Sequence, residues 1–149
     1  MQNENRIQLH FLIRPVFLKN RTALKKFLLT FFKTEGKRVE AINYIFCTDK
    51  YLLQINQAYL KHNTFTDIIT FEISKTHQPL VADIYISVER VRENARTFES
   101  SFSRELHRVI FHGAFHLCGY QDKTIKQSLQ IRKLEDQTLR EYFVSRESF

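Results

Sequence analysis

The sequence predicts an α+β protein that folds as a single domain over residues 1–149, with one mixed sheet of about four strands packed with about five helices. Its length suits one domain with a substantial core of its own. Hydrophobic residues make up 43% of the chain and charged residues 26%, the balance of a globular protein and not of a disordered chain. Segments typical of strands do not strictly alternate with segments typical of helices, so we expect layers around one mixed sheet.

The first half of the chain contains two expected strands and two expected helices. Residues 7–12 and 39–47 are rich in β-branched and aromatic side chains, as strands are. Residues 21–35 carry apolar side chains at helical spacing, and Gly36 follows where a C-terminal cap belongs. The next helix begins at Thr48 or Asp49 and is formed by Leu52, Ile55, Asn56 and Tyr59.

The second half contains two more strands and three helices. Residues 67–73 and 81–86 are expected strands, joined by a polar stretch that suits a hairpin-like connection. Ser87 is a plausible N-cap for a helix, and Ser101 or Ser103 for the next one. A last helix is expected over residues 123–143. The apolar-face residues of these helices are Val88, Val91, Ala95 and Phe98, then Leu106, Ile110, Gly113 and Leu117, and finally Ile131, Leu134 and Tyr142.

The N-terminus and the two cysteines indicate a cytoplasmic protein with reduced thiols. The first residues are polar and are then interrupted by Arg14 and Pro15, so we expect no signal peptide. The longest strongly apolar stretch, residues 27–32, is far shorter than the roughly 20 residues that span a bilayer. We therefore expect no membrane partner.

The net charge of +7 is concentrated in the N-terminal half, where residues 1–75 carry 12 Lys and Arg against 6 Asp and Glu. Such a surplus favours an acidic partner, nucleic acid first. Lys25, Lys26 and Lys33 fall on the polar side of the first helix and are candidate RNA-binding residues, although an ordinary solvated face has the same pattern. Four further side chains could stack on bases: His10, Tyr59, His62 and Phe65. Of these, Tyr59 and Phe65 are expected to lie mostly in the core.

Residues 111–122, FHGAFHLCGYQD, carry the strongest chemical signal. His112 and His116 are four residues apart, so on a helix both imidazoles lie on one face and can chelate one metal ion. Gly119 can end the helix in a left-handed turn and bring Asp122 toward the same ion. Two imidazoles and one carboxylate leave open coordination positions, which is typical of a catalytic zinc site.

Other interpretations of this segment remain open. A histidine pair at this spacing also occurs on protein surfaces that bind no metal, and Asp122 could instead be the N-cap of the last helix. A fourth ligand is not apparent, because His107 and Cys118 point away from the pair. Gly113 stands where a zinc peptidase of the usual helical type has its general-base glutamate, which argues against that chemistry.

Three motifs together resemble the YbeY family of single-strand-specific endoribonucleases, also called rRNA maturation factors. HGAFHLCGY is similar to the family signature H-G-x-x-H-L-x-G-Y-D-H, YLKHNTFTDIITF to Y-R-x-x-D-x-P-T-D-V-L-S-F, and VADIYIS to L-G-D-I-x-I-S. The resemblance implies one zinc ion per chain, no small-molecule cofactor, and a hydrolase that acts on RNA. It also implies that small-subunit ribosomal RNA and the small ribosomal subunit are partners, in rRNA maturation and ribosome quality control.

Three of the departures from the family pattern bear on the site. The family's three histidine ligands map onto His112, His116 and Asp122, so a carboxylate replaces the third imidazole. An alternative alignment places Lys123 at that position, but Lys is not a metal ligand. Leu60 replaces the family's Arg, and Phe65 its Pro. Lys61 and His62 are adjacent to Leu60 and are further candidate RNA-binding residues.

Three functions are therefore weighed. The first is a metal-dependent endoribonuclease, in which the ion polarises a water or a phosphate oxygen. The second is a zinc peptidase or amidase, which Gly113 disfavours. The third is a ribosome-associated RNA-binding factor with a non-catalytic metal site. This alternative stays open because Leu60 replaces the family's Arg. The first is preferred, and the third is the alternative.

Overall fold

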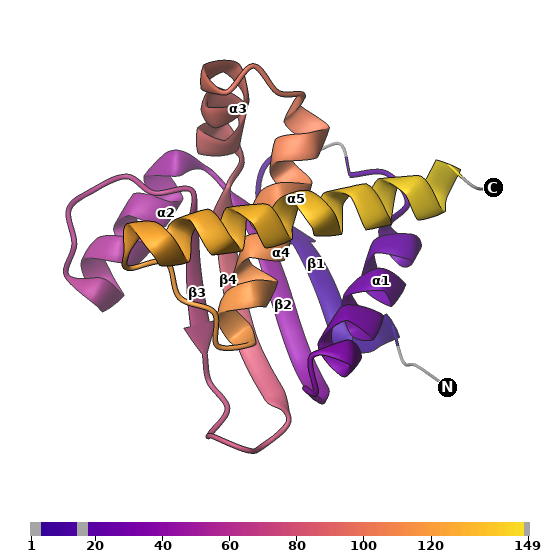
Figure 1. Ribbon diagram of the computed structural model, residues 1–149. Helices are drawn as coiled ribbons and strands as arrows, with labels where there is room; N and C mark the ends of the chain where they lie inside the picture. The colour runs from indigo at the N-terminus through magenta and orange to yellow at the C-terminus, as the bar shows by residue number, and fades with distance from the viewer. Residues whose placement is uncertain (1–3, 15–17, 148–149) are drawn as a thin grey trace.

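The computed structural model describes residues 4–14 and 18–147, which form one mixed four-stranded sheet with helices packed against it (Figure 1). Within these residues the strands are β1 (Ile7–Phe11), β2 (Val39–Cys47), β3 (Ile68–Glu72) and β4 (Leu80–Ser87). The α-helices are α1 (Arg21–Thr34), α2 (Asp49–Ile55), α3 (Val88–Thr97), α4 (Phe102–Leu117) and α5 (Ile125–Glu147). A short 3₁₀ turn, Glu4–Arg6, precedes β1, and a π-helical turn, Asn56–Leu60, continues α2. The predicted α+β class with one mixed sheet is confirmed.

The strand order is β1-β2-β4-β3, so β1 and β3 form the two edges of the sheet. β1, β2 and β4 run parallel, and β3 is antiparallel to β4. The hairpin-like connection expected between residues 73 and 81 therefore exists. The two central strands are buried most deeply, as strands with neighbours on both sides are.

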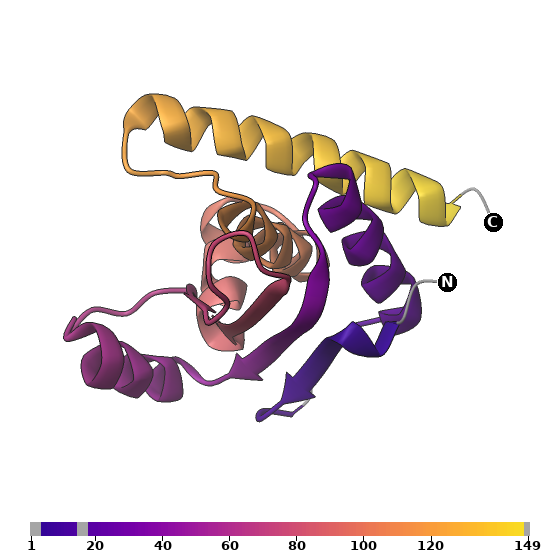
Figure 2. The ribbon, with the colours of Figure 1, turned by 90° about the horizontal axis from the view of Figure 1, so that it is seen from below.

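The main core lies between one face of the sheet and the helices α1, α4 and α5, with α4 against β3 and β4 and α5 lying over α4 (Figure 2). Tyr44 of β2 is fully buried there, and its hydroxyl donates a hydrogen bond of 2.9 Å to the carbonyl of Ile110. The opposite face is covered partly by α2, which encloses a small second cluster of Cys47, Leu52 and Ile69. Phenylalanine contributes several of the largest core side chains, since Phe32, Phe46 and Phe111 are fully buried.

Helix α4 is the central element, because it is buried on nearly every side. It begins at the Ser101 cap, whose hydroxyl accepts a hydrogen bond from the Arg104 amide. Gly113 allows the helix to approach the sheet closely, since a Cβ at this position would lie 3.0 Å from the Ile68 side chain. Gly119, with φ of +95°, reverses the chain after the helix.

Several sequence expectations need correction. Phe98 is not on the buried face of α3 but at its C-terminal cap, where it is 53% exposed, because the helix ends at Thr97. Tyr59 and Phe65 are not core residues, since they are 70% and 55% exposed. Helix α5 begins two residues later than expected and continues past residue 143. Within the described residues, none of the helices is both long and apolar enough to span a membrane.

Candidate metal centre

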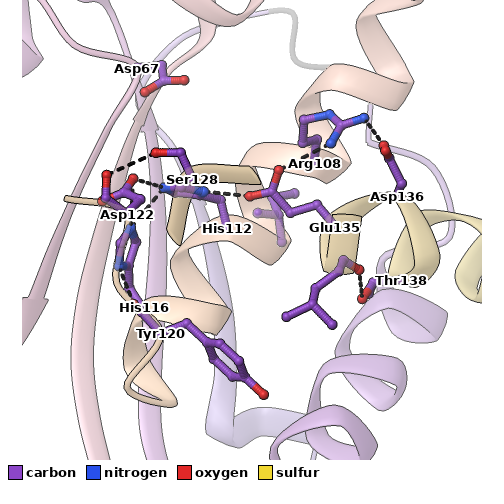
Figure 3. A network of polar contacts seen from close by, with 12 residues as sticks. Asp67, Arg108, His112, His116, Tyr120, Asp122, Ser128, Glu135, Asp136 and Thr138 are labelled. Carbon is purple, nitrogen blue, oxygen red and sulfur yellow. Dashed lines mark hydrogen bonds and ion pairs between the residues drawn. The ribbon is translucent and has the colours of Figure 1, made fainter. Parts of the chain in front are cut away.

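Two imidazoles and a carboxylate meet at the C-terminal end of α4. His112 and His116 lie one turn apart in the helix, and the reversal at Gly119 carries the following loop back across them (Figure 3). Asp122 lies in that loop, and one ligand atom from each of the three residues falls within 4.8 Å of the other two. The loop is fixed by Ser128 of α5, whose hydroxyl donates a hydrogen bond of 3.0 Å to the Asp122 carbonyl.

The three side chains turn their ligand atoms toward one shared space. The Nε2 atoms of the two histidines are 2.9 Å apart. Oδ2 of Asp122 lies 3.4 Å from Nε2 of His112 and 3.6 Å from Nε2 of His116. Ligands about 2.0–2.1 Å from a tetrahedral zinc ion are separated by about 3.3 Å, and the observed distances lie on both sides of that value.

The other nitrogen of each imidazole is already engaged. Nδ1 of His116 donates to the Tyr120 carbonyl at 2.9 Å, and Nδ1 of His112 forms a hydrogen bond of 2.5 Å with Oε2 of Glu135. With the proton on Nδ1, the lone pair of each Nε2 is free to bind a cation. This pattern, in which a carbonyl or carboxylate orients each ligand histidine, is typical of metal sites.

Glu135 belongs to a buried charge network behind His112. Its side chain is 5% exposed, and Oε1 accepts a hydrogen bond of 3.2 Å from Arg108. Arg108 also donates to Asp136 and lies 3.8 Å from Glu105. Because both oxygens of Glu135 are used, one by Arg108 and one by His112, the carboxylate is held in a single orientation.

The charges around His112 change its pKa. Burial lowers the pKa of this imidazole, but the hydrogen bond and charge of Glu135, with smaller contributions from Asp122 and Asp67, raise it above the usual value. Burial also raises the pKa of Asp67, although His112 acts in the opposite direction. A cation in this centre would therefore find several negative groups and would compete with a proton for His112.

The metal centre lies between two cavities. The first, here called the β3 cavity, has a volume of about 630 Å³ and is lined by β3 and the preceding loop, including Leu60, His62 and Phe65. The second, called the α5 cavity, has a volume of about 390 Å³ and lies toward α3 and α5. Both share the side chains of Asp67, His112 and Asp122, so a bound strand could occupy the two at once.

The candidate RNA-binding residues are divided by the fold. His62 lines the β3 cavity, and the adjacent Lys61 is exposed at the end of the π-helical turn. The candidate lysines of α1 are Lys25, Lys26 and Lys33. They do not line either cavity at the candidate metal centre, because α1 packs beside β1 at the opposite edge of the sheet from β3 (Figure 1).

Sequence reasoning missed the residues around the ligands. Glu135 lies one helical turn after the buried Ile131 on α5, and an acid on that face signals a buried partner. Asp67 lies in the motif YLKHNTFTDIITF, but it is not among the predicted site residues, although it lines both cavities. The alternative role of Asp122 as the cap of the last helix is wrong, since Thr124 accepts the amide hydrogen bond of Gln127 at 3.1 Å.

The family model and the curated relatives that match this chain identify one family. The family model described as endoribonuclease YbeY matches residues 16–143. A curated endoribonuclease YbeY from Flavobacterium psychrophilum is 50% identical over 111 residues, covering 74% of this chain and 79% of that protein. Another, from Cytophaga hutchinsonii, is 44% identical over 122 residues, covering 82% of this chain and 85% of its own. A solution structure from Thermotoga maritima, 26% identical, superposes with a TM-score of 0.64 over 95% of this chain and 92% of that one.

Proposed function

The chain belongs to the endoribonuclease YbeY family, and on that premise we propose that it is a zinc-dependent endoribonuclease that cleaves single-stranded RNA. The observation that carries the proposal is the centre at the end of α4, where two imidazoles and one carboxylate face a common point. Three protein ligands leave positions for water and substrate, as catalytic zinc sites do. The proposed unit is the whole chain, residues 1–149, acting as one domain with one zinc ion.

His112, His116 and Asp122 are the proposed ligands. A zinc ion held there would supply Lewis acidity toward a water molecule or a phosphate oxygen. Glu135 and the Tyr120 carbonyl keep the two imidazoles in the tautomer that presents Nε2. Because the third ligand is a carboxylate, the net charge of the site is one unit lower than with a third imidazole, which makes a bound water less acidic.

The proposed substrate is small-subunit ribosomal RNA, bound in the cytoplasm, and the proposed role is in rRNA maturation and ribosome quality control. The family motifs and the basic N-terminal half support this assignment. His62 lines the β3 cavity beside the proposed ligands, and the adjacent Lys61 is exposed, so both residues would meet RNA bound there. Lys25, Lys26 and Lys33, at the other edge of the sheet, would hold a more distant part of a large RNA through phosphate contacts.

A second function is favoured by one observation. Leu60 is 41% exposed and lines the β3 cavity at the position where the family motif has Arg. Without that cation, fewer positive charges hold a scissile phosphate beside the ligands. The alternative is therefore a ribosome-associated RNA-binding factor whose metal site does not catalyse.

The deciding experiment measures metal content and RNA cleavage on the same untagged protein. Wild type is compared with His116→Ala and Asp122→Ala, and His77→Ala in the exposed β3–β4 connection is the matched control. We expect about one zinc per chain and cleavage of single-stranded but not double-stranded RNA, with both lost in the two ligand variants and retained in the control. Bound zinc and RNA binding without cleavage would support the binding factor, and no bound metal would contradict the proposed centre.

A further inference from the structure

Two exposed pairs of phenylalanine and arginine flank the metal centre. Phe65 and Phe98 are 55% and 53% exposed. The guanidinium carbon of Arg90 lies 5.2 Å from the centre of the Phe65 ring, and that of Arg132 lies 5.4 Å from the centre of the Phe98 ring. Both distances are within the range of cation–π contacts, so each ring is held in place although it remains open to solvent.

Each ring belongs to a different one of the two cavities. Phe65 lines the β3 cavity and Phe98 lines the α5 cavity. His112 and Asp122 form part of the wall of both cavities. A chain with one group in each cavity therefore passes along the wall that His112 and Asp122 share between them.

The charges that line the α5 cavity favour a neutral group over an anionic one. Four carboxylates line it: Asp67, Glu105, Asp122 and Glu135. Of its two arginines, Arg108 is already paired with buried acids, and Arg132 lies against Phe98. These negative charges would repel a phosphate. They would not repel a neutral planar base, because a base carries no net charge.

The cavity also has groups suited to a base. Its volume of about 390 Å³ falls within the range of small-molecule pockets. The exposed Phe98 ring offers a stacking surface, and stacking on an aromatic side chain tolerates any base. Asn94, whose amide donates to Asp67 at 3.3 Å, lines the same cavity and can bond to a base edge.

We propose that the α5 cavity is a nucleobase subsite, in which a base adjoining the scissile phosphate stacks on Phe98 with Arg132 against the ring. The β3 cavity, with Phe65 and Arg90, receives a base on the other side of that phosphate. A base reaches either ring only when it is unpaired, so the two subsites select single-stranded nucleic acid. The inference rests on the proposed function, because it assumes that the strand crosses the metal centre.

The test measures binding of a fluorescein-labelled single-stranded DNA of about eight nucleotides, within the footprint of single-strand binding folds. A second oligonucleotide has the same length and phosphates but abasic sugars. Wild type is compared with Phe98→Leu, Phe98→Tyr and Arg132→Gln. The control is Leu129→Ala, because Leu129 is an exposed apolar residue that lines neither cavity.

Loss of one stacked base, worth about 1–3 kcal/mol, predicts that Phe98→Leu binds about 5- to 150-fold more weakly. Phe98→Tyr should bind like wild type, Arg132→Gln should be weakened less, and the control should be unchanged. The abasic strand should bind weakly to all variants, with no further loss in Phe98→Leu. The inference is overturned if Phe98→Leu binds within about twofold of wild type, or if it weakens the abasic strand equally.

Cleavage of RNA by the same proteins separates this inference from the proposed function. Cleavage by wild type with unchanged DNA binding in Phe98→Leu would reject the subsite and keep the enzyme. Weakened DNA binding in Phe98→Leu, with no cleavage by wild type, would keep the base subsite and reject the enzyme. If both hold, Phe98→Leu should raise KM for RNA with little change in kcat, since the ring binds a base and does not touch the reacting atoms.

Discussion

Replacing Glu135 by Gln should weaken metal binding although this residue is not a ligand. The carboxylate of Glu135 is 5% exposed and serves two donors, Nδ1 of His112 at 2.5 Å and Arg108 at 3.2 Å. An amide has one oxygen, so it can accept from only one of them and turns an N–H toward the other. His112 then loses the partner that fixes its tautomer.

The expected loss follows from this geometry. Substitution of a residue that orients a metal ligand typically costs 10–100-fold in metal affinity, which converts to about 1.4–2.7 kcal/mol. The metal-free protein should also lose about 1–3 kcal/mol of stability, because a buried donor on Arg108 or His112 is left without an acceptor. The remaining partner Asp136 keeps Arg108 paired, so the loss should stay below that of a fully broken buried ion pair.

Competition titration with a zinc chelator measures the affinity, and urea unfolding of the metal-free protein measures the stability. Glu141→Gln is the matched control, since Glu141 is exposed on the same helix and its carboxylate accepts a hydrogen bond of 3.3 Å from Gln137. A zinc affinity for Glu135→Gln within about twofold of wild type would refute the reasoning. That result would assign Glu135 to the stability of the fold alone.

Gly113→Ala should destabilise the protein by about 1 kcal/mol in urea unfolding, because the new Cβ would lie 3.0 Å from the Ile68 side chain. The gain in helix propensity compensates for only part of this loss. An unchanged midpoint would show that the Ile68 side chain moves aside without cost. Burial raises the pKa of Asp136, but the hydrogen bond and charge of Arg108, with the charges of Arg132 and Arg104, together lower it below its usual value of 3.8. Its stabilisation is thus present above about pH 3.8 and lost as the pH falls through the lower folded value, so Asp136→Asn should be less stable by at most about 1 kcal/mol at pH 7 and equal to wild type in strong acid. A gap that persists below both pKa values would contradict this. Leu60→Arg should lower KM for RNA. It should also steepen the slope of the logarithm of the RNA-binding constant against log salt concentration by about 0.7, the value for one added phosphate contact to a single strand. An unchanged slope would show that position 60 does not face the RNA.

The α+β class, the four strands and the three candidate ligands could all be predicted from the sequence, because each depends on local patterns. Period-two and helical spacing mark the strands and helices, and the i, i+4 relation places His112 and His116 on one face without any tertiary information. The motif resemblance then added the family, which the comparisons show.

The tertiary structure decided which distant side chains complete the centre. Glu135 is 23 residues from His112 in sequence, and only the packing of α5 on α4 brings its carboxylate to the imidazole. It also separated the lysines of α1 from the cavities, because the strand order places β1 and β3 at opposite edges. The spacing of Val91, Ala95 and Phe98 predicts one apolar helix face, yet α3 ends at Thr97 and leaves Phe98 exposed beside Arg132. Sequence periodicity gives the face of a helix but not where the helix ends or what packs on it, and those two facts determine the surroundings of this site.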